Sequence, residues 1–217
     1  MSKYNQGILG PFSGKVGPVV GAFWKGRNVM RVRPAHMTNP QTEDQMRVRQ
    51  RLSILSVFLS PFREALKIGM KKKMAEFAIT AVNAGIKMNQ LATTGSYPNM
   101  SVDPATVQLS NGLGFNVGTP TMAAAAAGQT VNLQWVNNAG IDPTCTDDDL
   151  VIFCIRNKST GQVVMDAVSA IRVDQAAQVA CPQSWAGERV QGFVFTTNVD
   201  GDIISPTAYM GEVVLNS

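Results

Sequence analysis

The chain has 217 residues, of which 45% are hydrophobic and 16% charged, with a formal net charge of +4 at pH 7. This length fits one large domain or two small ones with a true hydrophobic core. The longest strongly apolar stretch, residues 52–62, is too short to cross a bilayer, and the first fifteen residues contain no continuous apolar segment. Three cysteines give no disulfide framework. We therefore expect no membrane span, no signal peptide and a cytoplasmic or particle-associated protein.

The two halves of the chain carry opposite charge. Residues 1–100 hold 15 lysines and arginines against four acids, and residues 101–217 hold four bases against eleven acids. An asymmetry of this size indicates that the basic half contacts nucleic acid, an anionic surface or an acidic neighbour in an assembly. A solvated basic face is the alternative interpretation.

Residues 19–33 predict a β-hairpin. Two short apolar runs, Val19–Trp24 and Val29–Arg33, flank a turn that contains glycine and asparagine. Arg31 and Arg33 in the second run predict a cationic edge. Because a lone hairpin is marginally stable in water, we expect it to pack on something.

Helical signals begin at Asn39-Pro40, where a capping side chain precedes proline and two acids, Glu43 and Asp44. Apolar residues then recur at alternating spacings of four and three, at Val48, Leu52, Leu55, Leu59 and Phe62. The middle of this helix is apolar nearly all round, so we expect it to be buried by its own domain or by other subunits. Ser60-Pro61 starts a second helical segment, which continues the apolar stripe to about Gly85.

From about Asp103 onward, turn signals separate short strand-like runs. The predicted strands are Thr106–Leu109, Val131–Val136, Leu150–Ile155, Val163–Asp166, Ala177–Cys181, Arg189–Thr196 and Ala208–Leu215. Seven short strands are typical of an immunoglobulin or fibronectin-III-like β-sandwich, and the Ala123–Ala127 tract is expected to be a connection. The predicted fold class is therefore α+β. Residues 1–100 form a basic glycine-rich arm, a β-hairpin and helices, and residues 101–217 form an Ig-like β-sandwich.

Residues suited to catalysis or metal binding are scarce. The single histidine, His36, has no acid or cysteine near it in sequence, so any catalytic triad would depend on that residue alone. Residues 11–17 resemble a phosphate-binding loop but lack its first glycine and the Ser/Thr after Lys15. An acidic cluster without EF-hand or CxxC spacing is expected to be a solvated loop; it comprises Asp142, Cys145, Asp147, Asp148 and Asp149. We expect no enzyme activity, no cofactor, no metal and no small-molecule substrate.

Basic side chains are better candidates for a functional surface. Nucleic-acid binding would need several of them on one face, with an exposed aromatic ring for stacking. The chain has no RNP motif, zinc finger or clear helix-turn-helix, so only nonspecific phosphate contact is predicted. The residues expected to bind an anionic partner are Arg31, Arg33, Arg47, Arg49, Arg51, Lys71, Lys72 and Lys73.

Two blocks of the first hundred residues resemble known sequences. Gly7-Ile8-Leu9-Gly10, Phe12–Gly17, Trp24-Lys25-Gly26, Arg31 and Pro34 resemble the opening of an uncharacterised family of Bacteroidota proteins of roughly 200 residues. That family carries no established activity, so the resemblance implies no functional residues. The phrase from Asn39-Pro40 through Thr42 and Gln45 to Arg49 is similar to one in small phage and prophage structural proteins, which favours an assembly role.

These observations favour a non-enzymatic structural protein that self-associates, as in a virion, a prophage particle or another multi-subunit particle. The residues predicted for the assembly interface are Leu52, Leu55, Phe58, Leu59 and Trp24. The alternative is a nonspecific nucleic-acid-binding protein that uses the basic helices. Salt separates the two hypotheses, because phosphate binding weakens steeply with salt whereas apolar association does not. An enzyme or carbohydrate-binding sandwich would need a cleft with titrating groups, for which this sequence supplies little material.

Overall fold

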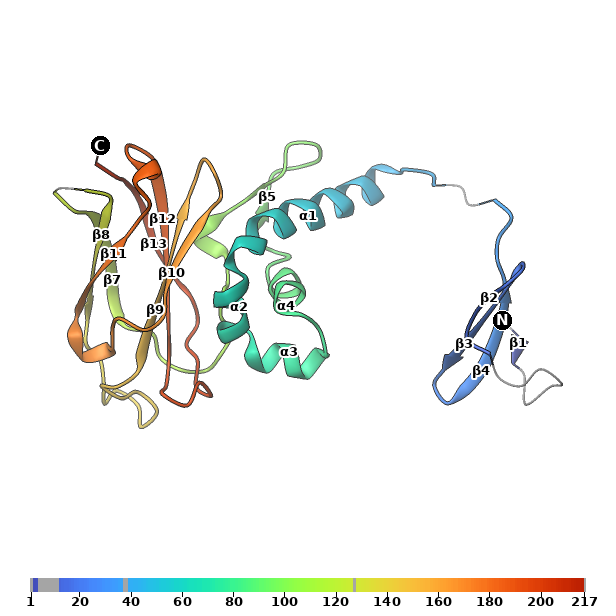
Figure 1. Ribbon diagram of the computed structural model, residues 1–217, viewed down its shortest axis with the longest axis horizontal. Helices are drawn as coiled ribbons and strands as arrows, with labels where there is room; N and C mark the ends of the chain where they lie inside the picture. The colour runs from blue at the N-terminus through green and yellow to red at the C-terminus, as the bar shows by residue number, and fades with distance from the viewer. Residues whose placement is uncertain (1, 4–11, 37–38, 127, 217) are drawn as a thin grey trace. The chain divides into compact units, whose positions relative to one another are not determined.

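The computed structural model describes residues 2–3, 12–36, 39–126 and 128–216, and the chain divides into two compact units, Met1–Thr42 and Glu43–Ser217 (Figure 1). The protein is mixed α+β, with one long helix, several antiparallel sheets and a β-rich C-terminal part, as the sequence predicts at that level. The boundary expected near residue 100 falls inside the second unit. There, side chains of the helices and of the later strands share one core.

The first unit contains an antiparallel sheet in the order β1-β4-β3-β2. Its strands are β1 (Ser2–Lys3), β2 (Gly14–Val16), β3 (Val19–Trp24) and β4 (Arg27–Val32). The predicted hairpin is confirmed as β3 and β4, in which Trp24 pairs with Arg27 across a two-residue turn. Lys25 and Gly26 in that turn have φ of 47° and 75°. Positive φ at both central residues matches the twist of the flanking strands.

The second unit opens with a run of helices. They are α1 (Glu43–Leu59), η1 (Ser60–Phe62), α2 (Arg63–Gly69), α3 (Lys71–Phe77) and α4 (Ala81–Met88). The expected helix start at Asn39-Pro40 is wrong, because Gln41 adopts φ of 47° and α1 begins only at Glu43. The predicted second start at Ser60-Pro61 is confirmed as η1. No helix in the described part of the chain is long and apolar enough to span a bilayer.

Two larger antiparallel sheets follow, in the orders β11-β8-β7 and β10-β9-β12-β13, together with a short ladder of β5 (Thr93–Thr94) and β6 (Ser101–Val102). Six of the seven predicted strands are confirmed with closely similar bounds, as β8 (Thr130–Val136), β9 (Leu150–Asn157), β10 (Val163–Asp166), β11 (Ala176–Ala180), β12 (Arg189–Thr197) and β13 (Ala208–Val214).

The predicted first strand, Thr106–Leu109, is wrong. Asp103 caps the short helix η2 (Pro104–Thr106) instead, because its carboxylate accepts a hydrogen bond from the Ala105 N–H at 3.0 Å. The missing strand is β7 (Gly118–Ala124), which takes up part of the alanine tract that was expected to be a connection.

The sheet β10-β9-β12-β13 is covered on both faces. On one face, Phe153 of β9 packs in a cluster with Leu133 and Trp135 of the β11-β8-β7 sheet. On the other face, Cys154 of β9 belongs to a second cluster formed with the helices, which includes Leu59. The second unit is therefore built in three layers, two sheets and one layer of helices (Figure 1). Burial on both faces explains the nearly continuous apolar run of β9 and the burial of β12 from Val190 to Thr197.

Candidate assembly and anion-binding surfaces

One face of the N-terminal sheet combines basic and apolar side chains. Residues directly opposite each other on antiparallel strands share a face of the sheet. Val20 lies opposite Arg31, Ala22 opposite Val29 and Trp24 opposite Arg27, and Lys15 lies opposite Val20 from the other side. We call this surface the basic face; it comprises Lys15, Val20, Ala22, Trp24, Arg27, Val29 and Arg31.

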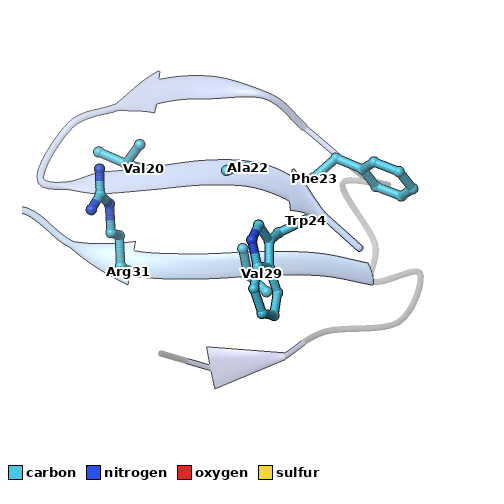
Figure 2. Close-up of a pocket in the computed structure, with 6 residues that line it drawn as sticks. All are labelled: Val20, Ala22, Phe23, Trp24, Val29 and Arg31. Carbon is cyan, nitrogen blue, oxygen red and sulfur yellow. The ribbon is translucent and has the colours of Figure 1, made fainter. Parts of the chain in front are cut away.

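The basic face is hollowed. A cavity of about 240 Å³ is lined by Val20, Ala22, Phe23, Trp24, Val29 and Arg31. Figure 2 shows Trp24 and Val29 toward one end of this hollow and Arg31 with Val20 toward the other. The ammonium group of Lys25 lies 5.0 Å from the centre of the exposed Trp24 ring, which adds a cation–π contact at the rim. A hollow with an apolar floor and cations at its rim is suited to bind an apolar side chain that has acidic side chains next to it.

The opposite face of the same sheet carries no charged side chain on β3 or β4. The alternation of residues along these strands places Val19, Phe23, Met30 and Val32 on this apolar face. Phe23 is 70% exposed and Val32 71% exposed. Phe12 lies against Gly21 and covers the centre of this face, whereas Phe23 and Val32 stay exposed at its two ends. Exposed apolar patches mark interaction surfaces. The sheet therefore presents a surface suited to a partner.

Helix α1 supplies a second exposed apolar surface in its first half. Leu52, one of the predicted interface residues, is 55% exposed and lines a groove of about 150 Å³ with Val48, Arg51 and Ile86. The predicted interface residues Leu55, Phe58 and Leu59 are buried in the chain's own core instead. Phe58 stacks on Phe62 at 5.8 Å, and the Arg156 guanidinium lies 4.3 Å from its ring centre. Of the five predicted interface residues, Leu52 and Trp24 are accessible.

The structure does not gather the predicted basic residues on one surface. Arg31 and Arg33 belong to the first unit, and the six others belong to α1 and α3 of the second. Several of these six contact acids of the same chain, in the pairs Arg47–Asp44 at 3.0 Å, Lys71–Asp202 at 2.9 Å and Lys73–Glu76 at 2.8 Å.

The remaining basic residues differ in exposure. Lys72 is exposed, Arg49 contacts the Met46 sulfur at 4.0 Å, and Arg51 is half-buried beside the α1 groove. The Lys71 ammonium group donates a hydrogen bond to Asp202, which lowers the pKa of that carboxyl group. Part of the charge asymmetry is thus compensated inside the second unit.

The acidic cluster lies on the loop between β8 and β9, and among the described residues no group of His, Cys, Asp or Glu is placed to hold a metal ion. Asp142 accepts hydrogen bonds from the hydroxyl and the N–H of Thr144, and these lower the pKa of Asp142. Asp147 accepts from the side-chain amide of Asn137 at 2.7 Å. Asp147 and Asp148 are exposed, as the prediction of a solvated loop requires.

The groups considered for catalysis show no activation. His36 is exposed in the first unit. The three cysteines are free thiols, and burial raises the pKa of Cys154 to about 12 and that of Cys181 to about 11. A thiol with so high a pKa is a poor nucleophile at neutral pH. Cys154 of β9 is fully buried and acts as a small core residue.

Sequence reasoning missed the apolar face of the first unit and the exposed side chain of Val57 on α1. The alternation along residues 19–24 and 27–32 contained the signal for the apolar face. Once the two-residue turn is fixed, that alternation assigns every side chain of the hairpin to a face.

The fold defines a two-unit α+β protein, and its small N-terminal sheet presents exposed apolar side chains on one face and basic side chains on the other. Residues 11–211 match a family of unknown function, DUF6266, and the chain belongs to this family. The match confirms the expected membership of an uncharacterised family. A comparison with curated proteins finds no match.

Proposed function

We propose that this is a non-enzymatic structural protein that self-associates, as a component of a virion, a prophage particle or another multi-subunit particle. The observation that carries the proposal is the apolar face of the N-terminal sheet, where Phe23 and Val32 are exposed. Removing apolar surface from water lowers the free energy by about 25 cal/mol for each Å² that is buried, so association that covers this face is favourable.

Two further features support this role. Leu52 and Val57 give α1 of the second unit an exposed apolar surface of its own. We also propose that the two large sheets form a fibronectin-III-like sandwich, since their strand orders β11-β8-β7 and β10-β9-β12-β13 correspond to the three-stranded and four-stranded sheets of that fold. A sandwich with a buried core suits a particle subunit, because its fold does not depend on the neighbouring subunits. The phage-like phrase between residues 39 and 49 agrees with such a setting.

Nonspecific nucleic-acid binding is the second candidate function. The observation that favours it is the exposed Trp24 ring on the same face as Arg27 and Arg31. A ring for base stacking beside cations for phosphate contact is the arrangement that single-stranded nucleic acid requires. This candidate site is the basic face, rather than the helices that the sequence alone suggested.

Light scattering across a size-exclusion peak tests the proposal, with the 260/280 nm absorbance ratio recorded without nuclease treatment. We expect a mass well above one chain, a protein-like ratio, and association that persists in 1 M salt because apolar contacts survive it. Phe23→Ser with Val32→Ser should lower the mass. The matched control, Val168→Ser with Val199→Ser, removes exposed valines of the second unit and should keep it.

A wild-type protein that is monomeric in both low and high salt would refute self-association. A complex rich in 260 nm absorbance that falls to a monomer in high salt would establish the second candidate function instead.

A further inference from the structure

We propose that the basic face of one copy binds the acidic β8–β9 loop of a second copy, so that the chains associate head to tail. This inference rests on the proposed function and names the two surfaces that meet. It is carried by the charge and shape of these surfaces, each of which belongs to one compact unit of the chain.

The N-terminal unit has one sign of charge. Residues 1–42 contain six lysines and arginines and no aspartate or glutamate. On the basic face, Arg31 lines the hollow of about 240 Å³ together with Val29 and Trp24, and Lys15 and Arg27 lie on the same face of the sheet. Acids are therefore needed from another surface to neutralise this face.

The β8–β9 loop offers the complementary charge. Asp147 and Asp148 are exposed, whereas Asp149 is neutralised within the chain by Arg172 at 3.0 Å. The Val173 N–H donates to the Asp147 carbonyl oxygen at 3.2 Å, which places the neighbouring Asp174 next to the loop. Residues 137–149 contain four aspartates and no basic residue. The loop therefore keeps a negative charge that its own chain leaves exposed.

The loop also has a shape that fits the basic face. Ile141 is 67% exposed beside Asp142, so an apolar side chain projects from an acidic setting. Next to it, a wide hollow of about 640 Å³ is lined by Asn137, Ala139, Gly140, Cys145, Thr146, Asp147 and Asp148. In the proposed contact, Ile141 enters the hollow beside Trp24 while Asp147 and Asp148 meet the arginines of β4.

Two arrangements of a pair of chains are possible: the basic face on the acidic loop, or the basic face on a second basic face. The opposite charges of the face and the loop favour the first arrangement. Like charges placed against each other at an interface are strongly unfavourable, so the basic face does not pair with itself. A contact between two different surfaces is heterologous, and repetition of it builds a ring or an open chain. The apolar face of the sheet stays available for a lateral contact.

Charge reversal tests the contact on the full chain. The sheet-reversed variant carries Arg27→Glu with Arg31→Glu, and the loop-reversed variant carries Asp147→Lys with Asp148→Lys. Sedimentation velocity should show self-association at least ten-fold weaker for each variant alone. An equimolar mixture of the two should associate again, because each variant offers the other a surface of opposite charge.

Matched controls reverse the same number of charges elsewhere on the surface. Arg63→Glu with Lys67→Glu, and Glu64→Lys with Glu76→Lys, alter exposed residues of α2 and α3 and should leave association unchanged. If the loop-reversed variant unfolds on heating well below wild type, Ile141→Lys replaces it, because a lysine at this exposed position repels the basic face and also removes the apolar side chain.

The outcomes separate the two proposals. If the wild type and both reversed variants associate equally well, this inference is overturned and the proposed function stands. If the wild type is monomeric, both are overturned. A mixture that stays monomeric also overturns the inference. Loss of bound nucleic acid in the sheet-reversed variant, with its association unchanged, would assign the basic face to nucleic acid instead.

Discussion

Arg172 and Asp149 form a buried ion pair, with their side chains 1% and 5% exposed and the Nη2 and Oδ2 atoms 3.0 Å apart. The same guanidinium donates hydrogen bonds to the carbonyl oxygens of Phe115 at 2.7 Å and Asn116 at 3.1 Å. The carbonyl oxygen of Arg172 accepts a hydrogen bond from the Trp135 indole at 2.9 Å. Arg172 thus joins the start of β9 to the segment at Phe115 and Asn116 through its side chain, and to Trp135 near the end of β8 through its carbonyl oxygen.

Removing one partner of this pair should strongly destabilise the second unit. Asp149→Asn leaves the Arg172 charge buried without its counter-charge, which costs about 3–5 kcal/mol in comparable pairs. Urea unfolding measures the loss. Asp148→Asn is the matched control, because its side chain is exposed and its effect should stay within about 0.5 kcal/mol. Equal stabilities for the two variants would show that the pair does not hold the fold.

This ion pair shows what the sequence pattern cannot resolve. Asp149 stands in a run of three aspartates, and the sequence predicts one solvated acidic loop for all of them. Asp147 and Asp148 fit that prediction, but Asp149 turns inward because Arg172, 23 residues further on, is brought beside it by the fold. Only the tertiary packing decides which of these neighbouring aspartates is buried and which are exposed.

Strands were predictable where turns and β-branched residues coincide. The apolar run of β9 was found because both faces of this strand are buried, so few polar residues interrupt it, and β12 was found from the apolar residues Val190 and Phe193–Phe195. β7 was missed because alanines in its second half have low strand propensity and resemble a spacer. It is held by pairing with β8, from Gly118 opposite Val136 to Ala124 opposite Val131.

The long helix was predictable, but its buried part was not. Its middle is apolar all round, a pattern that either the chain's own core or a partner could satisfy. The structure buries Leu55, Phe58 and Leu59 in its own core and leaves Leu52 and Val57 exposed. Sequence periodicity does not show where along a helix the covering elements end.

Phe58→Asp should unfold the second unit rather than merely dissociate an assembly. The carboxylate would replace a buried ring that stacks on Phe62 and lies against the Arg156 guanidinium, so we expect a loss of at least about 3 kcal/mol. Thermal unfolding followed by circular dichroism measures it.

The neighbouring substitution Val57→Asp is the comparison for Phe58→Asp. Its side chain is 73% exposed, so the unfolding midpoint should change little while self-association weakens. If both variants kept the wild-type midpoint, the burial of Phe58 in this core would be contradicted.

Acid should weaken the link between β13 and the turn after β9. Glu212 on β13 accepts hydrogen bonds from the Gln191 amide at 2.7 Å and from the Lys158 ammonium group at 3.0 Å, and these lower the pKa of Glu212. A carboxyl whose pKa is depressed by folding contributes stability that is present above its unfolded value of about 4.3 and is lost as pH falls through the folded pKa.

The variant Glu212→Gln tests this pH dependence. It should be less stable than wild type at pH 7, and the two unfolding midpoints should converge as the pH falls below the unfolded-state pKa and Glu212 becomes protonated in the folded wild type. Differential scanning calorimetry across this range gives the comparison. Midpoint curves that stay parallel down to pH 3 would show that Glu212 contributes no acid-dependent stability.

The segment Glu43–Ser217 should fold without the N-terminal sheet and lose the ability to assemble. Both core clusters consist of residues from Leu55 onward, so the second unit keeps its core, and we expect its unfolding midpoint within about 2 °C of that of the full chain. Light scattering should report a monomer, because both faces of the sheet are absent. Full-length chain carrying Phe23→Ser with Val32→Ser is the comparison that retains the basic face. Undiminished association of Glu43–Ser217 would place the assembly surface on α1 or the sheets of the second unit.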